Sequence, residues 1–300
     1  MFTDVGDESG RGWRGDVVAA STPPTLRQRR LGAELRKLRE QAGLSSTEAA
    51  ARIGIQQARM SMIEAGRYGV SADRVRAMAH SYACGDGALI EALGNMTGRR
   101  GRNWWDEYRE LLPVALVEVA ELEAEATALR VAVLVSMPGL LQTVQQARAS
   151  YSQNVPVLQP YEVEHRSAFR VRRQGVLYET SSLPYTAVIH EAALRMGVGG
   201  PGVVRGQLEH LVHVGEQENV TILVIPFERA DFPVSGQPIT YASGPVPQLD
   251  TILLDSDHGC DLLYAEAQLA RYRAVLDRME RCALSEAKSR DFIHKIAKSL

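Results

Sequence analysis

A short run of polar side chains begins at Gln56, and its donors and acceptors can pair with the edges of nucleic-acid bases. The amides of Gln56 and Gln57 can pair with N6 and N7 of adenine, and the Arg59 guanidinium can fork onto O6 and N7 of guanine. The apolar side chains of Ala58 and Met62 can touch a thymine methyl group. The run therefore indicates direct reading of base edges, each good bidentate pair adding about 1 to 3 kcal/mol of discrimination.

Three arginines near this run are better placed to hold a phosphate backbone. We expect Arg36, Arg39 and Arg67 to contact phosphates, which fix the register of a protein on a duplex and make binding depend on salt. For Arg59 the alternative is a solvated or ion-paired side chain. Glu64 is interpreted as a structural carboxylate rather than a DNA contact.

Five short helices over residues 26–97 are predicted to position these side chains. Ser45 and Glu48 have the spacing of a capping box, which starts a helix, and Gly54 permits a tight turn after it. Two short helices joined by such a turn form a helix-turn-helix. The other expected helices run from about Leu26 to Gly43, from Gln56 to Gly66, onward from Ser71, and over 87–96.

The segment from Leu44 to Gln57, followed by Ile63-Glu64-Ala65-Gly66-Arg67, resembles the Xre/Cro-type helix-turn-helix family over about residues 31–83. The resemblance implies a five-helix domain whose third helix enters the major groove of double-stranded operator DNA. Ser46 stands where the family often has a glutamine that helps to hold the DNA, so Ser46 is included among the expected DNA contacts. Ala49 stands where leucine is usual, which predicts a slightly smaller core.

The distribution of charge agrees with a two-domain chain. The length of 300 residues is suited to two domains, and a hydrophobic content of 45% with 23% charged residues is that of a globular protein. Residues 1–103 hold 16 Lys and Arg against 11 Asp and Glu, a net of +5, whereas the remainder holds 18 against 25, a net of -7. We expect a disordered leader over 1–25, a polyanion-binding domain over 26–97, a linker over 98–103 and a larger domain over 104–300.

The larger domain is predicted to be α/β and closed by helices, because short apolar runs of strand length alternate with helical spacing. The expected strands are Val131 to Met137, Tyr185 to Ile189, Val220 to Phe227, Thr251 to Asp255 and Leu262 to Ala265; the expected helices are Glu162 to Val176, Glu191 to Met196, Val203 to Val214 and a helical tail from about Leu269.

Apolar residues at helical spacing from Trp105 to Leu129 form a long seam. Pro113 cannot lie inside a helix, so we expect a break there and a restart with Pro113 in the first turn. Two interpretations stay open: a helix pair that packs on its own domain, and a dimer seam. Because a single module of this size binds DNA weakly, we expect a homodimer.

Six motifs follow in the order of the carboxy-terminal domain of WhiJ-like regulators, which the chain resembles from Trp104 to its end. The resemblance implies a transcription regulator, often encoded beside a small partner protein that is thought to bind it much as a toxin pairs with an antitoxin. The chain departs from the family over 231–236 and 253–255. The motifs start at Met137-Pro138-Gly139, Arg170-Val171-Arg172, His190-Glu191-Ala192, Gly206-Gln207-Leu208, Asn219-Val220-Thr221 and Ala283-Leu284-Ser285.

A second group of arginines, Arg170, Arg172 and Arg173, lies in the otherwise acidic larger domain. One interpretation is a solvated helix face paired with nearby glutamates. The other is a binding site for an acidic partner protein or an anionic ligand, because guanidinium groups form bidentate bonds to carboxylates and phosphates.

No set of residues indicates catalysis, a cofactor or a metal. Cys84, Cys260 and Cys282 lack CxxC spacing and are expected to be reduced thiols. The one candidate metal cluster, Asp257, His258 and Cys260, has a composition that is common in inert loops. His190-Glu191 and Asp255 supply an acid and a base, but no Gly-rich phosphate loop, GxSxG elbow or HExxH helix accompanies them. We therefore expect a protein that is not an enzyme.

These patterns together predict a sequence-specific regulator of transcription whose larger domain receives a small partner protein or a ligand. The longest apolar runs are far shorter than the roughly 18 to 20 residues of a membrane span, and the start of the chain lacks a secretory signal. We expect a cytoplasmic protein that associates with the nucleoid when bound to DNA. One alternative is an antitoxin-like module that neutralises a small partner and regulates its own operon. The other is a small-molecule sensor, which requires a closed apolar pocket in the larger domain.

Overall fold

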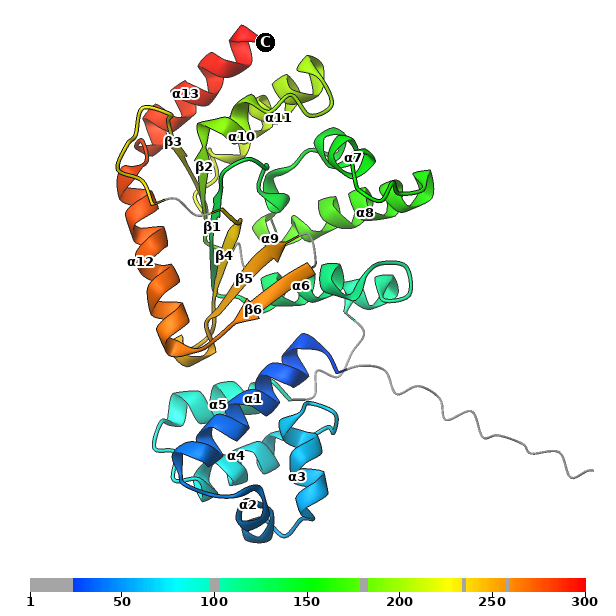
Figure 1. Cartoon of the computed structure of the whole chain (residues 1–300), viewed down its shortest axis with the longest axis vertical. Coiled ribbons are helices and arrows are strands. Elements are labelled where there is room, and N and C mark those ends of the chain that lie inside the picture. The colour runs from blue at the N-terminus through cyan, green and yellow to red at the C-terminus, as the bar shows by residue number, and fades with distance from the viewer. Residues whose placement is uncertain (1–23, 98–102, 179–182, 234–235, 257–258) are drawn as a thin grey trace, which may run out of the picture.

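The computed structural model describes residues 24–97, 103–178, 183–233, 236–256 and 259–300. A unit of five helices lies beside a larger unit built around one sheet (Figure 1). The expected fold class, a helical helix-turn-helix domain followed by an α/β domain closed by helices, is confirmed. The expected leader lies outside the described residues except for Pro24 and Thr25, and so does the expected linker except for Asn103.

Local sequence signals place the five helices of the first unit. The Ser45–Glu48 capping box starts the second helix as predicted. Gly43, Gly54 and Gly66 each follow the end of a helix and have positive φ angles of 69°, 68° and 71°. The helices are α1 (Leu26–Gln41), α2 (Ser46–Arg52), α3 (Gln57–Glu64), α4 (Ala72–Ser81) and α5 (Gly87–Asn95).

The larger unit contains a six-stranded mixed sheet in the order β3-β2-β1-β4-β5-β6. The first three strands in this order are parallel, and β4, β5 and β6 continue the sheet antiparallel to their neighbours. The strands are β1 (Ala128–Val133), β2 (Tyr185–His190), β3 (Val220–Ile225), β4 (Ile239–Ser243), β5 (Thr251–Ser256) and β6 (Gly259–Leu263).

Helices cover both faces of this sheet. Buried side chains of α11 and α13 pack on one face with the parallel strands, and those of α12 pack on the other face. The remaining elements are η1 (Trp104–Tyr108), α6 (Val114–Glu125), η2 (Gly139–Leu141), α7 (Val144–Ser152), α8 (Pro160–Arg173), α9 (Gly175–Tyr178), α10 (Glu191–Arg195), α11 (Pro201–Val214), η3 (Pro247–Leu249), α12 (Glu266–Cys282) and α13 (Glu286–Ser299).

Two expected strands of this unit have different bounds in the structure, and one strand was not expected. The first strand covers Ala128–Val133 rather than 131–137, because its extent is set by pairing with β2 and β4. The last strand covers Gly259–Leu263 rather than 262–265, because it pairs with β5 in a hairpin. The five-residue β4 was not predicted, since a run this short gives weak periodicity.

The apolar seam expected from Trp105 to Leu129 is divided among three elements. It forms η1, then α6, and ends in β1, with Pro113 as the residue before α6 rather than within its first turn. Trp105 and Val117 are buried with Phe169 of α8 in one cluster. This packing agrees with the interpretation that the seam serves its own domain.

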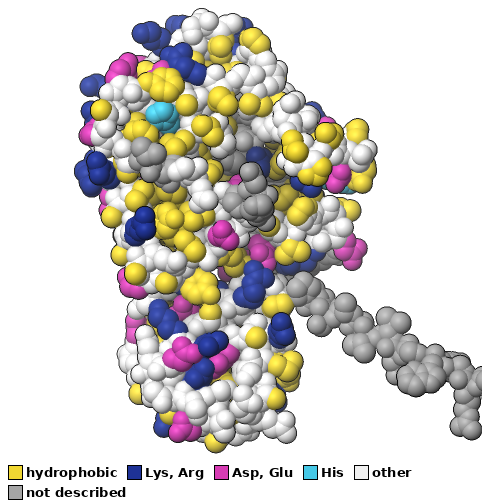
Figure 2. Space-filling view, in the orientation of Figure 1, with side chains coloured by type: hydrophobic (Ala, Val, Ile, Leu, Met, Phe, Trp, Pro, Cys, Tyr) yellow, Lys and Arg dark blue, Asp and Glu magenta, His cyan; other side chains and the backbone are white. Residues whose placement is uncertain are grey.

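The connection between β4 and β5 joins the two units. Leu249 is 7% exposed and packs within the core cluster of the helical unit, although it belongs by chain order to the α/β unit. The Arg30 guanidinium of α1 donates to the carbonyl oxygens of Gln248 (2.7 Å) and Asp250 (3.3 Å). Acidic and basic side chains lie side by side along this boundary (Figure 2). Apolar packing and hydrogen bonds therefore hold the units together.

We expect Leu249→Ala to cost about 2 to 4 kcal/mol of unfolding free energy and to separate the unfolding of the two units, because the side chain fills the helical core from the other unit. Calorimetry would detect two transitions where the parent protein shows one. As a control, Leu111→Ala alters an exposed leucine and is expected to leave a single transition. Unchanged cooperativity in Leu249→Ala would contradict the coupling.

Candidate nucleic-acid interface

The start of α3 presents the predicted base-reading side chains to solvent. Gln56, Gln57, Ala58 and Arg59 are exposed, while Met60 behind them is fully buried. The alternation follows from the helical repeat, which turns Met60 into the core and leaves its neighbours outside. A contiguous exposed face at the N-terminus of the second helix of a helix-turn-helix is the surface that enters a major groove.

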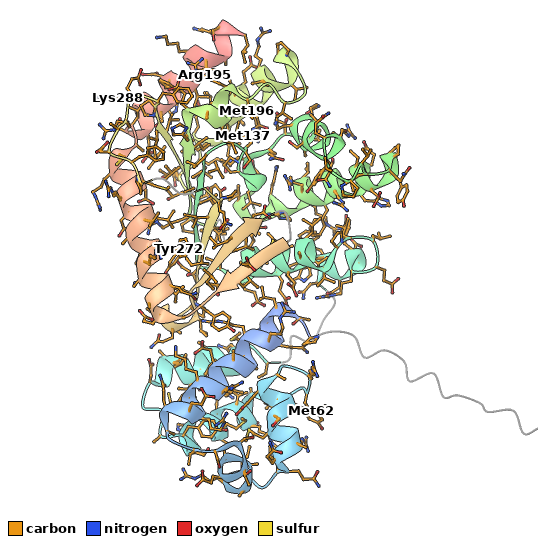
Figure 3. The ribbon with its side chains drawn as sticks, viewed as in Figure 1. Met62, Met137, Arg195, Met196, Tyr272 and Lys288 are labelled. Atoms are coloured by element: carbon orange, nitrogen blue, oxygen red, sulfur yellow. The ribbon has the colours of Figure 1, made fainter. Side chains whose placement is uncertain are left out.

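An exposed methionine and a stacked arginine extend this face. Met62 is 44% exposed and points outward from α3, away from the sheet (Figure 3). The Arg59 guanidinium lies over the ring of Tyr68, 4.4 Å from its centroid, and forms no ion pair with the described residues. Tyr68 was not among the predicted site residues; the signal was an aromatic residue just after the recognition helix. Stacking restricts the guanidinium while its N–H groups stay available.

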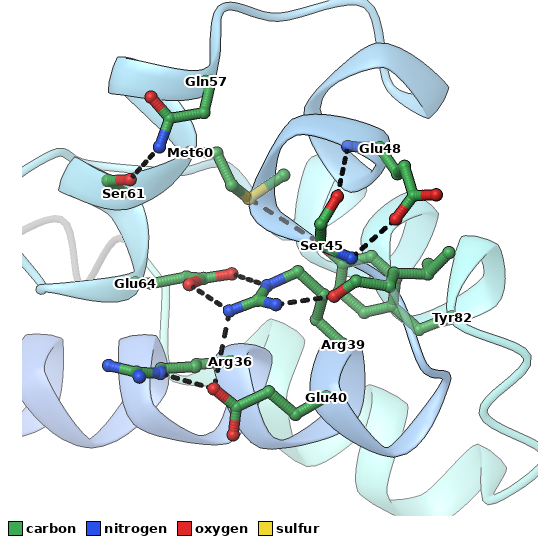
Figure 4. Close-up of polar contacts among 11 residues, drawn as sticks. Arg36, Arg39, Glu40, Ser45, Glu48, Gln57, Met60, Ser61, Glu64 and Tyr82 are labelled. Atoms are coloured by element: carbon green, nitrogen blue, oxygen red, sulfur yellow. Dashed lines mark hydrogen bonds and ion pairs between the residues drawn. The ribbon is translucent and has the colours of Figure 1, made fainter.

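Arg39 has a structural role, which corrects the expectation that it contacts phosphate. Its side chain is buried, and its Nε and Nη2 donate to the two carboxylate oxygens of Glu64 at 2.6 and 3.0 Å. Its Nη1 donates to the carbonyl oxygen of Leu44 at 2.7 Å (Figure 4). Hydrogen bonds to Glu64 raise the pKa of Arg39 above its ordinary value. The pair ties α1 to the end of α3, as the structural interpretation of Glu64 requires.

The other expected phosphate contacts differ in exposure. Arg36 is exposed and pairs with the exposed Glu40 at 2.7 Å, so it can exchange that partner for a phosphate at little cost. Arg67 is also exposed, just beyond α3. Ser46 is half-buried at the start of α2, and its Oγ has no hydrogen-bond partner among the described residues.

Because one partner of a buried pair is costly to remove, Arg39→Ala is expected to lower the unfolding free energy by roughly 2 to 3 kcal/mol. Arg36→Ala, a change to an exposed arginine of the same helix, is the matched control and is expected to have little effect on stability. Urea unfolding of the three proteins tests this. Equal midpoints for the two variants would restore a surface role for Arg39.

The arginines of the larger unit make contacts within the chain, in agreement with the interpretation of a paired helix face, and their role in binding a partner or ligand stays a prediction. Arg173 is buried and pairs with Glu123 at 2.5 Å. Arg172 pairs with Glu107 and lies over the Trp104 ring. Arg170 is half-buried, donates to Gln142 and stacks on Tyr151. The paired glutamates belong to η1 and α6 and the stacked aromatic rings to η1 and α7, not to α8 itself.

The acid-base residues singled out in the sequence have structural partners. His190 caps α10 by accepting a hydrogen bond from the Ala192 amide at Nδ1 (3.2 Å), and burial lowers its pKa. Glu191 accepts from the Phe227 amide and from Arg195. Within the described residues no group of three metal-ligating side chains occurs. Asp257 and His258 lie outside those residues.

A buried carboxyl group lies at the domain boundary. Glu121 of α6 is 6% exposed, and its Oε2 forms no hydrogen bond with the described residues. Burial, together with the negative charges of Glu125 and Glu118, raises the pKa of Glu121 to about 7 despite the nearby positive charges of Arg109 and Arg27.

The raised pKa predicts that Glu121 destabilises the protein once it ionises. Below about pH 4.5 the carboxyl is protonated in both the folded and the unfolded chain. Between pH 4.5 and 7 the unfolded chain releases this proton more readily than the folded chain, so the unfolding free energy falls as the pH rises. Glu121→Gln is therefore expected to raise the unfolding free energy by about 2 to 3 kcal/mol at pH 8 and to have little effect at pH 4. Urea titrations at both pH values measure this difference. Glu209→Gln, on the exposed side of α11, is the control. If Glu121→Gln changed the unfolding free energy equally at both pH values, the prediction would be contradicted.

Comparison with known protein families agrees with this geometry. Residues 30–93 match the model of a helix-turn-helix domain, so the first unit is of the class found in DNA-binding regulators. Residues 116–295 match the model of the Domain of unknown function (DUF5753), and the chain belongs to that family. No curated protein matches the chain, and no solved structure does. None of the described helices has the length and apolar character needed to cross a membrane.

Proposed function

We propose that the chain is a sequence-specific transcription regulator of the Xre/Cro type with a WhiJ-like larger domain, and that α3 reads double-stranded operator DNA. The observation that carries the proposal is the exposed start of α3, where Gln56, Gln57 and Arg59 stand over a buried Met60. Arg59 is the principal base contact because Tyr68 restricts it while its N–H groups are not taken by a carboxylate. Arg36 and Arg67 supply phosphate contacts.

Two copies of the chain act together in this proposal. One recognition helix of eight residues gives few contacts, and specific affinity in the usual range requires two half-sites about one helical turn apart. Sedimentation of the protein with an operator selected from random DNA would give two chains per duplex. A complex with one chain on a single half-site would contradict the homodimer.

The larger domain controls DNA binding, and we propose that it does so by receiving a ligand rather than by catalysis. The contacts of Leu249 and Arg30 across the boundary support this role, because a shift of the β4–β5 connection changes the position of α1. A pocket at the same boundary favours a small molecule over the small partner protein of an antitoxin-like module.

Arg59→Ala is expected to weaken binding to the selected operator by about 1 to 3 kcal/mol, with a much smaller effect on random DNA, because it removes a contact to a base. Arg67→Ala is the matched comparison. Loss of a phosphate contact is expected to weaken binding to both DNAs equally and to reduce the salt slope by about 1. Fluorescence anisotropy at several salt concentrations measures both. Equal losses on both DNAs for Arg59→Ala would reject base reading by this residue.

A further inference from the structure

A pocket of about 560 Å³ lies between the two domains. Arg27, Ala92 and Met96 line it from the helical domain, and Glu121, Leu122 and Leu262 line it from the α/β domain. The volume is in the range of small-molecule sites, which are commonly found where domains meet. Because its walls belong to both domains, an occupant of this pocket touches the DNA-binding unit directly.

The positive charges around the pocket are already neutralised. Arg27 pairs with Glu125 at 2.5 Å, Arg29 with Glu118 at 2.8 Å, and Arg30 with Glu34 at 3.0 Å. Arg30 also lies over the Tyr264 ring and donates to carbonyl oxygens of the β4–β5 connection. An anionic ligand would have to displace a carboxylate from one of these arginines.

The negative charges are not balanced in the same way. Glu121 lines the pocket, is 6% exposed, and has an oxygen without a hydrogen-bond partner among the described residues. The exposed Asp261 also lines the pocket and forms no ion pair with them. A buried carboxylate that lacks a partner is stabilised by a cation that reaches it.

We propose that this pocket binds an organic amine, with the ammonium group on Glu121 and the apolar body against Leu122 and Leu262. The ammonium donates up to three hydrogen bonds, including one to the carboxyl group of Glu121, which lines the pocket, and the apolar body displaces water from the half-buried leucines. Burial and the neighbouring glutamates raise the pKa of Glu121, which means that they disfavour its ionised form when the pocket is empty. The positive charge of a bound amine favours the ionised form.

Control of DNA binding by the amine rests on the proposed function. The amine touches the wall formed by α1 and α5, so its binding is coupled to the docking of the helical domain on Leu249 and Arg30. A ligand whose affinity differs between the docked and the shifted arrangement changes the spacing of paired recognition helices.

The test uses the full chain without DNA and three dansyl probes of similar size. Dansylcadaverine carries an ammonium group, N-butyl dansylamide has no charged group, and dansyl aminocaproate carries a carboxylate. We expect saturable fluorescence enhancement with dansylcadaverine and binding at least about tenfold weaker with the other two. Glu121→Gln, which keeps the shape of the side chain, is expected to weaken dansylcadaverine binding about tenfold, and the distant Glu209→Gln is expected to leave it unchanged.

Absence of saturable binding by dansylcadaverine, equal binding of all three probes, or unchanged affinity in Glu121→Gln would overturn the amine site. Anisotropy with operator DNA then tests the coupling separately. A shift of DNA affinity by dansylcadaverine in the parent protein, but not in Glu121→Gln, supports it, and unchanged DNA affinity rejects it. Amine binding by a protein that binds no DNA would reject the proposed function while leaving the site in place.

Discussion

Leu249 follows β4 in the α/β domain, yet its side chain is buried in the core of the helical domain. Arg30 completes this junction by donating to the carbonyl oxygens on either side of Leu249. Gly244 allows the connection to turn back so closely, since a Cβ at this position would lie 2.8 Å from the backbone of Leu249. The placement of the DNA-binding unit, and of the pocket beside it, depends on this insertion.

Within the helical domain, the exposed face of α3 depends on a polar contact beneath it. The bidentate pair of Arg39 and Glu64 joins α1 to α3. Both side chains are largely buried, where an unpaired charge would be costly. Gly32 lets the same helices approach closely, because a Cβ there would lie 2.4 Å from the carbonyl oxygen of Glu64. Arg59 and Met62 can then be exposed without loss of support for the helix that carries them.

Arginines near the domain boundary and in the larger domain serve mainly to bind carboxylates of the same chain. Arg173 with Glu123 and Arg27 with Glu125 are examples in which a buried or half-buried cation has a matched anion. Glu121 forms no ion pair with the described residues, although the positive charges of Arg109 and Arg27 favour its ionised form.

Local signals were sufficient to determine the helical domain, because capping residues, glycines and helical spacing act within a few residues, as Ser45, Glu48 and Gly54 show. They also determined which side chains of α3 are exposed. They did not determine the extent of β1, the presence of β4 or the burial of Arg39 and Arg173, since strand pairing and ion pairs join residues far apart in the chain. The burial of Glu121 beside other charged groups likewise exists only after α1, α6 and the β4–β5 connection come together, because burial and the positions of neighbouring charges are tertiary properties.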